Sequence, residues 1–398
     1  MPNRGAISGT GTRVTSSAAL AVVVGLCACT SPDTGPTSVT TATTAITPAV
    51  CPADDTASRN LGAGIWKAVS EEFANSTTDR FRDVRAVLVS VCGQPVVQQF
   101  LGSTAQDYHV VASVTKSVVS TLVGIAQAEG AIRSLDQNLD ELLPQRRRDM
   151  TPAVAAVTLR QLLTMSAGLD ADHLDNSASE WELSRDFVGA ILREGMQGPL
   201  GHFAYSSASS HVIAAILVQA TGRPVLDYAR VKLFDPLGIP SQPAAQPVLE
   251  PQSMTGYDSA GFTWPVDHQG VNIGGGWLKL TPGDMLKIGQ LYLDEGRYQG
   301  RQVVPAQWVH DATTQQVETD NGFAGPGYGF HWWVTTAGAD AAYAAIGFGG
   351  QVVEVVPARQ LVAVFSTELL ATTQFVRVDG KAFEDLVSYV VIPRLAVR

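Results

Sequence analysis

The chain has 398 residues, of which 45% are hydrophobic, enough apolar material for one large folded domain or two ordinary ones. It carries 37 Asp and Glu against 27 Lys and Arg, with no basic run that could follow a phosphate backbone. These features exclude a fibrous or disordered protein, and we expect no nucleic-acid partner.

The N-terminal segment has the pattern of an export signal. Arg4 and Arg13 precede the apolar stretch 18–26. That stretch is too short to span a bilayer but has the length of a signal-peptide core. We therefore expect the mature protein to act outside the cytoplasm.

The sequence Leu26-Cys27-Ala28-Cys29 resembles a bacterial lipobox, in which a small residue precedes the cysteine that receives lipid. Cys29 fits better than Cys27, because Leu26 stands where a small residue is wanted. We expect residues 1–28 to be a lipoprotein signal peptide and Cys29 to anchor the protein to the extracytoplasmic face of the cell membrane. The alternative is ordinary cleavage nearby, with Cys29 incidental.

Residues 29–57 are rich in Thr, Ser, Pro and Ala, so burial cannot offset the entropy of ordering them. We interpret them as a flexible stalk leading to a folded domain over 58–398. Cys51 and Cys92 remain, and an oxidising compartment permits a disulfide between them, although two free thiols fit the sequence equally well. No Cys/His cluster has metal-ligand spacing.

Strands are predicted at both ends of the domain. Residues 86–91 and 96–100 are β-branched runs separated by a turn, which predicts a hairpin. Late in the chain, further strands are predicted at 328–334, 342–346, 351–356 and 361–365, followed by a helix over 381–392 that Pro393 ends.

The section between these strands, from Ser113 to about Ala312, is mostly helical in pattern, with helix-start signals at Thr158 and Thr281. This order predicts an α+β fold, in which an antiparallel sheet is built from both termini and a helical subdomain at about 118–325 is inserted into it. The active site is expected between the two parts.

Ser113-Val114-Thr115-Lys116 opens an apolar helical pattern, so Ser113 and Lys116 are expected on one face of a buried helix. Burial and the positive end of the helix dipole both disfavour a charged ammonium. A neutral Lys116 can then accept the proton of Ser113, which becomes a nucleophile. The alternative is a surface lysine one turn from a capping serine.

Tyr205-Ser206-Ser207 lies in a predicted loop just before a helix. A phenol held beside a lysine can serve as a general base and then as an acid toward the leaving group, which is the role we predict for Tyr205. The alternative is a core tyrosine whose hydroxyl is capped by the helix.

Gly347-Phe348-Gly349-Gly350 lies beside two predicted strands, where glycines allow another group to approach the backbone. We predict that the N–H of Phe348 or of Gly350 joins the N–H of Ser113 in an oxyanion hole. The alternative is a glycine bulge at a sheet edge.

With these motifs in this order, the chain resembles the serine β-lactamase and penicillin-binding superfamily, nearest to its branch of class C β-lactamases, family VIII esterases and aminohexanoate-dimer-hydrolase-like proteins. Ser113 to Lys116 matches S-x-x-K, Tyr205 to Ser207 is similar to Y-x-N, and Gly347 to Gly349 takes the place of K-T-G or H-x-G. The similarity extends from about Leu61 to the C-terminus. The resemblance implies a β-lactamase/transpeptidase-like fold and covalent catalysis.

Two departures from that family bear on the substrate. Ser207 replaces an asparagine whose amide would bind an acylamino group, and Gly347 replaces a lysine or histidine that would pair with a carboxylate. Both weaken the case for β-lactamase or carboxypeptidase activity. We therefore expect Ser207 and the glycine segment to contact a small-molecule or peptide-like ester or amide.

The histidines do not have the spacing of a metal-binding motif. Those nearest the motifs above are expected to be structural: His202, His211, His268 and His331. Asp267-His268, Trp181 and Trp277 could line the cleft or simply pack. The segment 164–168 lacks the first glycine of an α/β-hydrolase nucleophile elbow, so that fold is a poor second.

The sequence thus predicts a serine hydrolase that needs no cofactor, because nucleophile, base and oxyanion donors are all protein groups. Two alternatives stay open: a cell-wall D-amino-acid peptidase or β-lactamase, and an inactive surface-anchored binding module. The sequence does not decide the oligomeric state.

Overall fold

The computed structural model describes residues 51–170, 179–243, 246–249, 256–319, 324–369 and 380–395. The predicted signal peptide, Cys29 and most of the predicted stalk lie outside the described residues. The folded unit considered below falls within residues 46–398. Its first helix begins at Asp55, after an N-cap at Asp54, so ordered structure starts slightly before the predicted boundary at residue 58.

The strands are β1 (Val84–Val91), β2 (Gln94–Phe100), β3 (His109–Val110), β4 (Lys279–Leu280), β5 (Arg297–Tyr298), β6 (Arg301–Gln302), β7 (Val317–Glu318), β8 (Gly327–Tyr328), β9 (Trp333–Ala337), β10 (Asp340–Gly347), β11 (Gln351–Val356) and β12 (Leu361–Thr367). The helices are α1 (Asp55–Asn75), α2 (Val114–Ala128), α3 (Leu139–Leu142), α4 (Pro152–Ala155), α5 (Leu159–Leu163), α6 (Phe187–Glu194), α7 (Ser207–Thr221), α8 (Val225–Ala229), α9 (Asp235–Leu237), α10 (Pro282–Leu293), α11 (Ala306–Thr313), α12 (Gly380–Leu386) and α13 (Ile392–Leu395).

The main sheet is built from both ends of the chain, as the sequence predicts. Its eight strands run in the order β2-β1-β12-β11-β10-β9-β8-β7, and every neighbouring pair whose register is described is antiparallel. The N-terminal hairpin β1–β2 therefore lies directly against the last strand, β12. The α+β fold class is confirmed.

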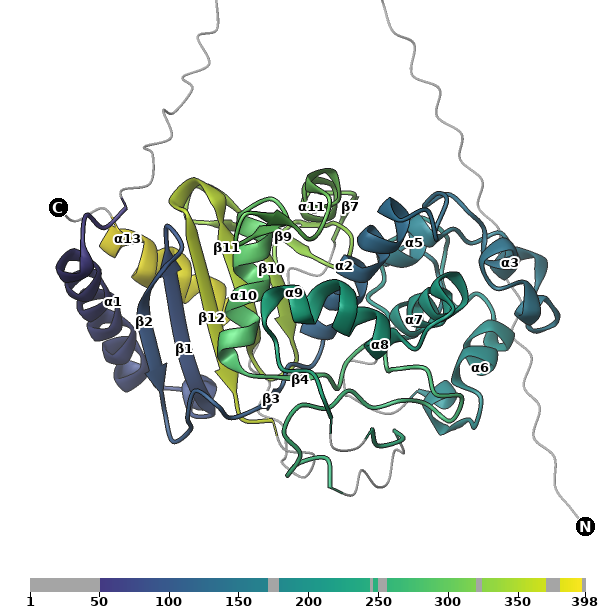
Figure 1. The fold of residues 1–398 in the computed structure, drawn as a ribbon, viewed down its shortest axis with the longest axis horizontal. Helices are drawn as coiled ribbons and strands as arrows, with labels where there is room; N and C mark the ends of the chain where they lie inside the picture. The colour runs from purple at the N-terminus through teal and green to yellow at the C-terminus, as the bar shows by residue number, and fades with distance from the viewer. Residues whose placement is uncertain are drawn as a thin grey trace, which may run out of the picture. The chain divides into compact units, whose positions relative to one another are not determined.

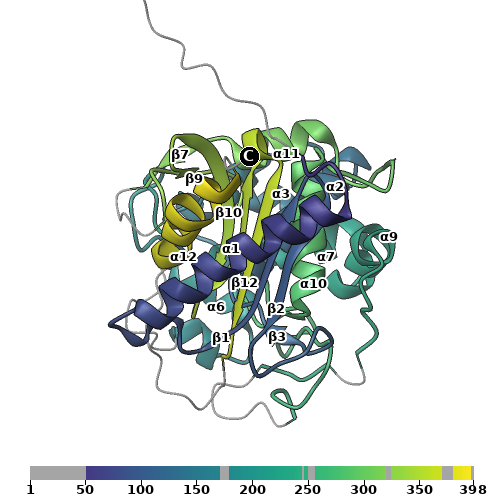
Figure 2. The ribbon, with the colours of Figure 1, turned by 90° about the vertical axis from the view of Figure 1, so that its left-hand side faces the viewer.

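Both faces of the sheet are covered, because alternate side chains of one strand enter two different cores. Leu88 of β1 belongs to one core, and its neighbours Val87 and Val89 belong to the other. Helix α1 crosses the second face, as Figure 2 shows, with the C-terminal helices beside it. Helix α10 packs on the opposite face, against β11 and β12.

The helical region and α1 lie on opposite sides of the sheet (Figure 1). Helix α2 lies between the sheet and the rest of the helical region. Helix α2 is buried along nearly its whole length and packs against α7. The predicted helix starts at Thr158 and Thr281 are present, since each caps the helix that follows. Helix α10 falls inside the predicted insertion but belongs to the sheet layer.

Three local features differ from the sequence prediction. The expected strand 328–334 is two strands, because His331 takes a left-handed conformation, with φ of +59°, between β8 and β9. Pro393 lies inside α13 and does not end the helix, since the preceding turn over Val387–Val391 is π-helical. The sequence also did not predict α1.

Cys51 and Cys92 form a disulfide, which joins the residues before α1 to the turn between β1 and β2. The pairing that the sequence left open is therefore present. Within the described residues, the longest apolar helices still fall short of what a membrane crossing requires.

Candidate functional site

Ser113 stands at the N-terminus of α2, just after the short strand β3. The segment before it is fixed by the pairing of β3 with β4 and by a 2.9 Å hydrogen bond from Val111 N–H to the carbonyl of Leu278. Ala112 takes a left-handed conformation, with φ of +45°, which a residue with a side chain rarely adopts. Backbone strain of this kind often occurs at functional sites, where the surrounding structure maintains it.

Lys116 is buried one turn into the same helix, with 1% of its surface exposed. Its Nζ lies 3.0 Å from Ser113 Oγ, 2.9 Å from Ser207 Oγ and 2.8 Å from the carbonyl oxygen of Gly275. The one-faced placement of Ser113 and Lys116 is thus as predicted.

This arrangement determines which way a neutral Lys116 points. A carbonyl can only accept, so one N–H of the amine is directed at Gly275, and a second can be donated to Ser207. The remaining lone pair then faces Ser113 Oγ. The geometry can therefore transfer the Ser113 proton to Lys116.

Ser207 is held in place by the start of α7. The preceding residue, Ser206, caps this helix by accepting from Ser209 N–H at 3.0 Å, and its hydroxyl donates to the carbonyl of Asp170. Ser207, in the first turn, thereby faces Lys116. The position where the resemblance would place an asparagine is filled by a hydroxyl that contacts the lysine directly.

The ring of Tyr205 lies beside Lys116, with its centroid 4.7 Å from Nζ. The ring also stacks against Trp333 of β9, at 5.6 Å with an interplanar angle of 18°. An aromatic face turned toward an amine stabilises the ammonium form once a proton has been accepted. The structure thus brings Tyr205 together with Ser113, Lys116 and Ser207.

The segment Gly347–Gly350 forms the turn between β10 and β11 beside the nucleophile. A Cβ at Gly347 would overlap the carbonyl oxygen of Val111, so this position admits no side chain. Glycine at this position and the close approach of the Val111 carbonyl therefore go together, and neither leaves room for the cation of the third motif.

Within that turn, the N–H of Gly350 donates to the carbonyl of Gly347 at 3.2 Å. The expectation that Gly350 N–H could bind an oxyanion is corrected, because the turn already uses this donor. Phe348, the other residue that the sequence proposed for this role, lies in the same turn. The carbonyl of Gly349 is held by the hydroxyl of Thr367 at 2.7 Å, which keeps the turn rigid.

His331 lies behind α2, with its Nδ1 3.0 Å from the carbonyl oxygen of Lys116. Complete burial is the main reason that its pKa is lowered to about 3, and it outweighs the hydrogen bond to the Lys116 carbonyl, which acts in the opposite direction. His331 is therefore neutral at physiological pH. It supports the helix and does not carry a charge into the site.

Of the residues that could either line the cleft or pack, two pack. Asp267 and Trp181 are buried, at 1% and 3% exposure, and pack inside the helical region. Asp267 pairs with His211, while His268 beside it is exposed. Trp277 is half-buried and follows Gly276, which lies near Ala112, so this tryptophan does border the site.

The carbonyl of Gly275 is a partner of Lys116 to which the sequence analysis gave no role. The available signal was the run Gly274-Gly275-Gly276, because consecutive glycines indicate close backbone approach. Within the residues that the structure describes, no three His, Cys, Asp or Glu side chains are arranged to hold a metal ion.

Comparison with known proteins places these residues in context. A model of the family described as Beta-lactamase matches residues 77–385. The 6-aminohexanoate-dimer hydrolase of Paenarthrobacter ureafaciens is 24% identical over 291 residues, which cover 67% of each chain.

Solved structures agree on the fold. A penicillin-binding protein homologue from Caulobacter crescentus superimposes with a TM-score of 0.63 at 16% identity, covering 84% of this chain and 98% of that one. EstCE1, described as a hydrolase with promiscuous acyltransferase activity, superimposes with a TM-score of 0.63 at 16% identity. The match covers 84% of this chain and 100% of the EstCE1 chain.

Proposed function

The chain belongs to the beta-lactamase family and is a serine hydrolase, and on that basis we propose that it cleaves an ester or amide through an acyl-enzyme on Ser113. The observation that supports this most directly is the triple contact of Lys116 Nζ with Ser113, Ser207 and the Gly275 carbonyl. A buried lysine held in this way has the position of a general base.

In the proposed first step, Lys116 takes the proton of Ser113 while Oγ bonds to the substrate carbonyl carbon. The carbonyl electron pair moves to oxygen, where the N–H groups of Ser113 and Phe348 stabilise the negative charge. When the intermediate collapses, Tyr205 protonates the leaving group and recovers a proton from Lys116. Water then releases the acyl group by the same route.

The substrate is proposed not to require a carboxylate for binding. Gly347 offers no cation for a substrate carboxylate, and Ser207 is too short to replace an asparagine amide. These features favour esters and simple amides over β-lactams. The name of the Paenarthrobacter relative makes the 6-aminohexanoate dimer one candidate substrate.

A cell-wall D-amino-acid peptidase or β-lactamase is the second candidate, suggested by the family and by the predicted export. An inactive binding module is the third. Against it, a buried lysine with three oxygen partners is costly to maintain unless it is used.

The test is hydrolysis of nitrophenyl esters, the 6-aminohexanoate dimer, nitrocefin and D-alanyl amides by the full-length protein, with Ser113→Ala as control. Ester or amide turnover that Ser113→Ala abolishes is the expected result. Preferred turnover of nitrocefin or D-alanyl amides would support the second candidate. A fluorophosphonate that fails to label Ser113 in folded protein would exclude the mechanism.

The membrane anchor at Cys29 is a separate proposal that rests on the lipobox-like sequence. We expect the wild-type protein to enter the membrane fraction of a bacterial host and to incorporate labelled palmitate. Cys29→Ala is expected to abolish the label, whereas Cys27→Ala keeps it. Equal labelling of wild type and Cys29→Ala would refute the assignment.

A further inference from the structure

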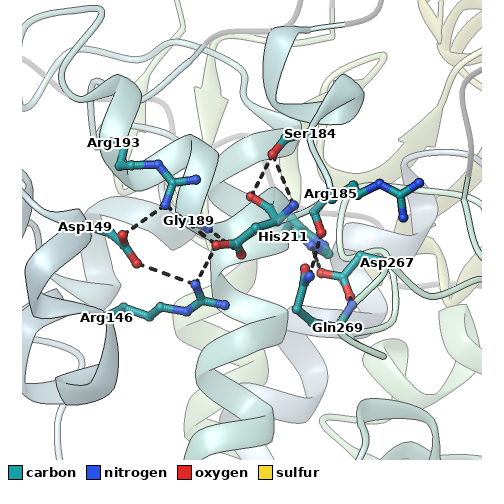
Figure 3. A network of polar contacts seen from close by, with 10 residues as sticks. Arg146, Asp149, Ser184, Arg185, Gly189, Arg193, His211, Asp267 and Gln269 are labelled. Atoms are coloured by element: carbon teal, nitrogen blue, oxygen red, sulfur yellow. Dashed lines mark hydrogen bonds and ion pairs between the residues drawn. The ribbon is translucent and has the colours of Figure 1, made fainter.

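A histidine and an aspartate that the proposed chemistry does not use are buried together behind the site. His211 lies on α7 and Asp267 in the loop that leads to the glycine run 274–276. Both side chains are inaccessible to solvent, and His211 Nε2 is 3.1 Å from Asp267 Oδ2. Figure 3 shows the two groups side by side. Such a pair adds little stability over apolar packing of the same volume, so its consequence lies in the groups that it orients.

The hydrogen bonds around Asp267 determine the tautomer of His211. Asp267 Oδ1 accepts from the backbone N–H groups of Gln269 and Val271, at 2.8 Å each, and Oδ2 faces His211. On its other side, Nδ1 of His211 lies 3.4 Å from the N–H of Gly274, which can only donate. Nδ1 therefore accepts, and the His211 proton resides on Nε2, where it is donated to Asp267.

The imidazole has little freedom to turn away from this arrangement. Trp181 stacks on its face, with centroids 5.9 Å apart and an interplanar angle of 16°. Phe187 meets it edge-on at 5.7 Å. The indole N–H of Trp181 is itself tied to Asp170 at 3.1 Å, so the stacking partner is also fixed.

The glycine that His211 holds is adjacent to the one that binds the lysine. Ser207 and His211 are four residues apart on α7 and so share a face of the helix. Along this face, His211 contacts Gly274, and Ser207 lies against Gly275. A Cβ at Gly274 would overlap the carbonyl of Ser210, so the segment lies flush on the helix.

We propose that His211 and Asp267 are positioning residues for the general base. The pair anchors the glycine run at the N–H of Gly274, and Ser207 packs closely against Gly275, so together these contacts restrain the carbonyl of Gly275. That carbonyl accepts from Lys116 Nζ at 2.8 Å and so turns the amine lone pair toward Ser113. This inference rests on the proposed function of Ser113 and Lys116.

Asp267→Asn tests the proposal with a change of almost no volume. The asparagine oxygen can keep the two loop N–H bonds, while its NH₂ group faces His211 Nε2 and forces the proton onto Nδ1. Two donors, Nδ1–H and Gly274 N–H, then oppose each other, and the glycine segment must move. We expect the rate of fluorophosphonate labelling of Ser113 and kcat/KM for a nitrophenyl ester to fall about 10- to 100-fold.

Asp149→Asn is the matched control. Asp149 is a buried carboxylate of the neighbouring ion-pair network in Figure 3, where it accepts from Arg193 at 2.9 Å and Arg146 at 3.5 Å. It makes no contact with the glycine segment, so its loss should affect stability without slowing labelling. The two variants therefore separate loss of a buried charge from loss of lysine alignment.

The pH profile gives a readout that a merely structural role would not change. The ammonium form of Lys116 loses a carbonyl acceptor in Asp267→Asn, so the acidic limb of kcat/KM should move to lower pH. His331 stays neutral in both proteins. Nitrogen NMR should show the His211 proton on Nε2 in the wild type and on Nδ1 in Asp267→Asn, with His211→Asn identifying the signal.

If fluorophosphonate labels Ser113 in Asp267→Asn and in Asp149→Asn at rates within about twofold of the wild-type rate, the inference is wrong. If Asp267→Asn does not fold, His211→Asn and His211→Leu replace it, because only asparagine can still accept from Gly274. Labelling that is faster in His211→Asn supports the proposal, and equal rates overturn it. Wild-type protein that does not label at Ser113 refutes the proposed function and this inference together.

Discussion

The hydroxyl of Thr115 donates to the carbonyl oxygen of Ala112 at 2.7 Å, and the backbone N–H of Thr115 donates to the same oxygen at 3.1 Å. This carbonyl belongs to the peptide unit whose N–H is that of Ser113. Because C=O and N–H point in opposite directions in a trans peptide, fixing the oxygen also aims the Ser113 N–H. Two donors on one carbonyl polarise the peptide and strengthen its N–H as an oxyanion donor.

Thr115→Val is therefore expected to slow acylation although the residue touches no substrate. Valine has nearly the shape of threonine and lacks only the hydroxyl, so the left-handed Ala112 loses one of the two hydrogen bonds to its carbonyl, and Leu278 N–H loses the acceptor that it contacts at 3.4 Å. We expect kcat for ester hydrolysis to fall about 10- to 100-fold, less than the loss on removing an oxyanion donor outright. Stopped-flow measurement of the acylation burst provides the check.

Thr115→Ser is the control, because it restores the hydroxyl without the methyl group. It should recover most of the rate at similar thermal stability. Should serine and valine slow acylation equally, the hydroxyl bond to Ala112 would have no part in catalysis.

Gly347→Ala is expected to remove activity for a steric reason. The new methyl group would overlap the carbonyl of Val111, two residues before the nucleophile, and displace Ser113 relative to Phe348 N–H. A displacement of about 1 Å is enough to cost about 100-fold in rate. Gly347→Lys should lose activity too and should not gain nitrocefin hydrolysis, although it restores the charge of the third motif. Nitrocefin turnover by Gly347→Lys would show that the missing cation, and not backbone packing, limits the site.

The reacting side chains were predictable because each lies in a short local pattern. Ser113 and Lys116 are one helical turn apart, and Tyr205 and Ser207 stand at a helix start. The sheet was predictable for the same reason, since β-branched runs such as that of β1 alternate between its two faces.

The supporting groups were not predictable, because they depend on tertiary contacts. His211 and Asp267 are 56 residues apart in sequence, and nothing in either neighbourhood indicates the other. The carbonyl of Gly275 has no side-chain signature at all. The break between β8 and β9 at His331 likewise reflects its bonds to α2 and not a local turn motif.

Removal of the Cys51–Cys92 disulfide is expected to destabilise the protein without changing the site. The bridge closes a loop of 41 residues that contains α1, and chain entropy in the unfolded state then favours folding by about 2–4 kcal/mol. Cys51→Ser with Cys92→Ser should lower the melting temperature, while the rate of Ser113 labelling at 25 °C stays unchanged. A reducing agent should lower the melting temperature of the wild type but not of the double variant. Unchanged stability of the double variant would contradict this expectation.

Glu354 is expected to make stability depend on pH. This carboxyl on β11 is completely buried, and neither of its oxygens has a hydrogen-bond partner among the described residues. Burial raises its pKa well above the usual value, and Glu384 on α12 raises it further; Lys381 opposes this and Asp385 adds to it, each with a smaller effect. The folded chain therefore holds this proton more tightly than the unfolded chain. The contribution of protonated Glu354 to folding stability is complete below the pKa that Glu354 has in the unfolded chain. It is lost as pH rises through the higher pKa of Glu354 in the folded chain.

Glu354→Gln keeps the volume but does not titrate, so its melting temperature should fall less than that of wild type as pH rises above 7. The variant should be more stable than wild type by about 1–3 kcal/mol at pH 8 and should lose this advantage at pH 5. His331 has the opposite sign, because its pKa is lowered to about 3, and it reduces stability only as pH falls below about 6.5. Measurements above pH 7 therefore isolate the effect of Glu354.

Glu71→Gln, an exposed change on α1, is the control. Parallel melting curves for wild type and Glu354→Gln from pH 5 to 9 would show that Glu354 is already ionised in the folded protein.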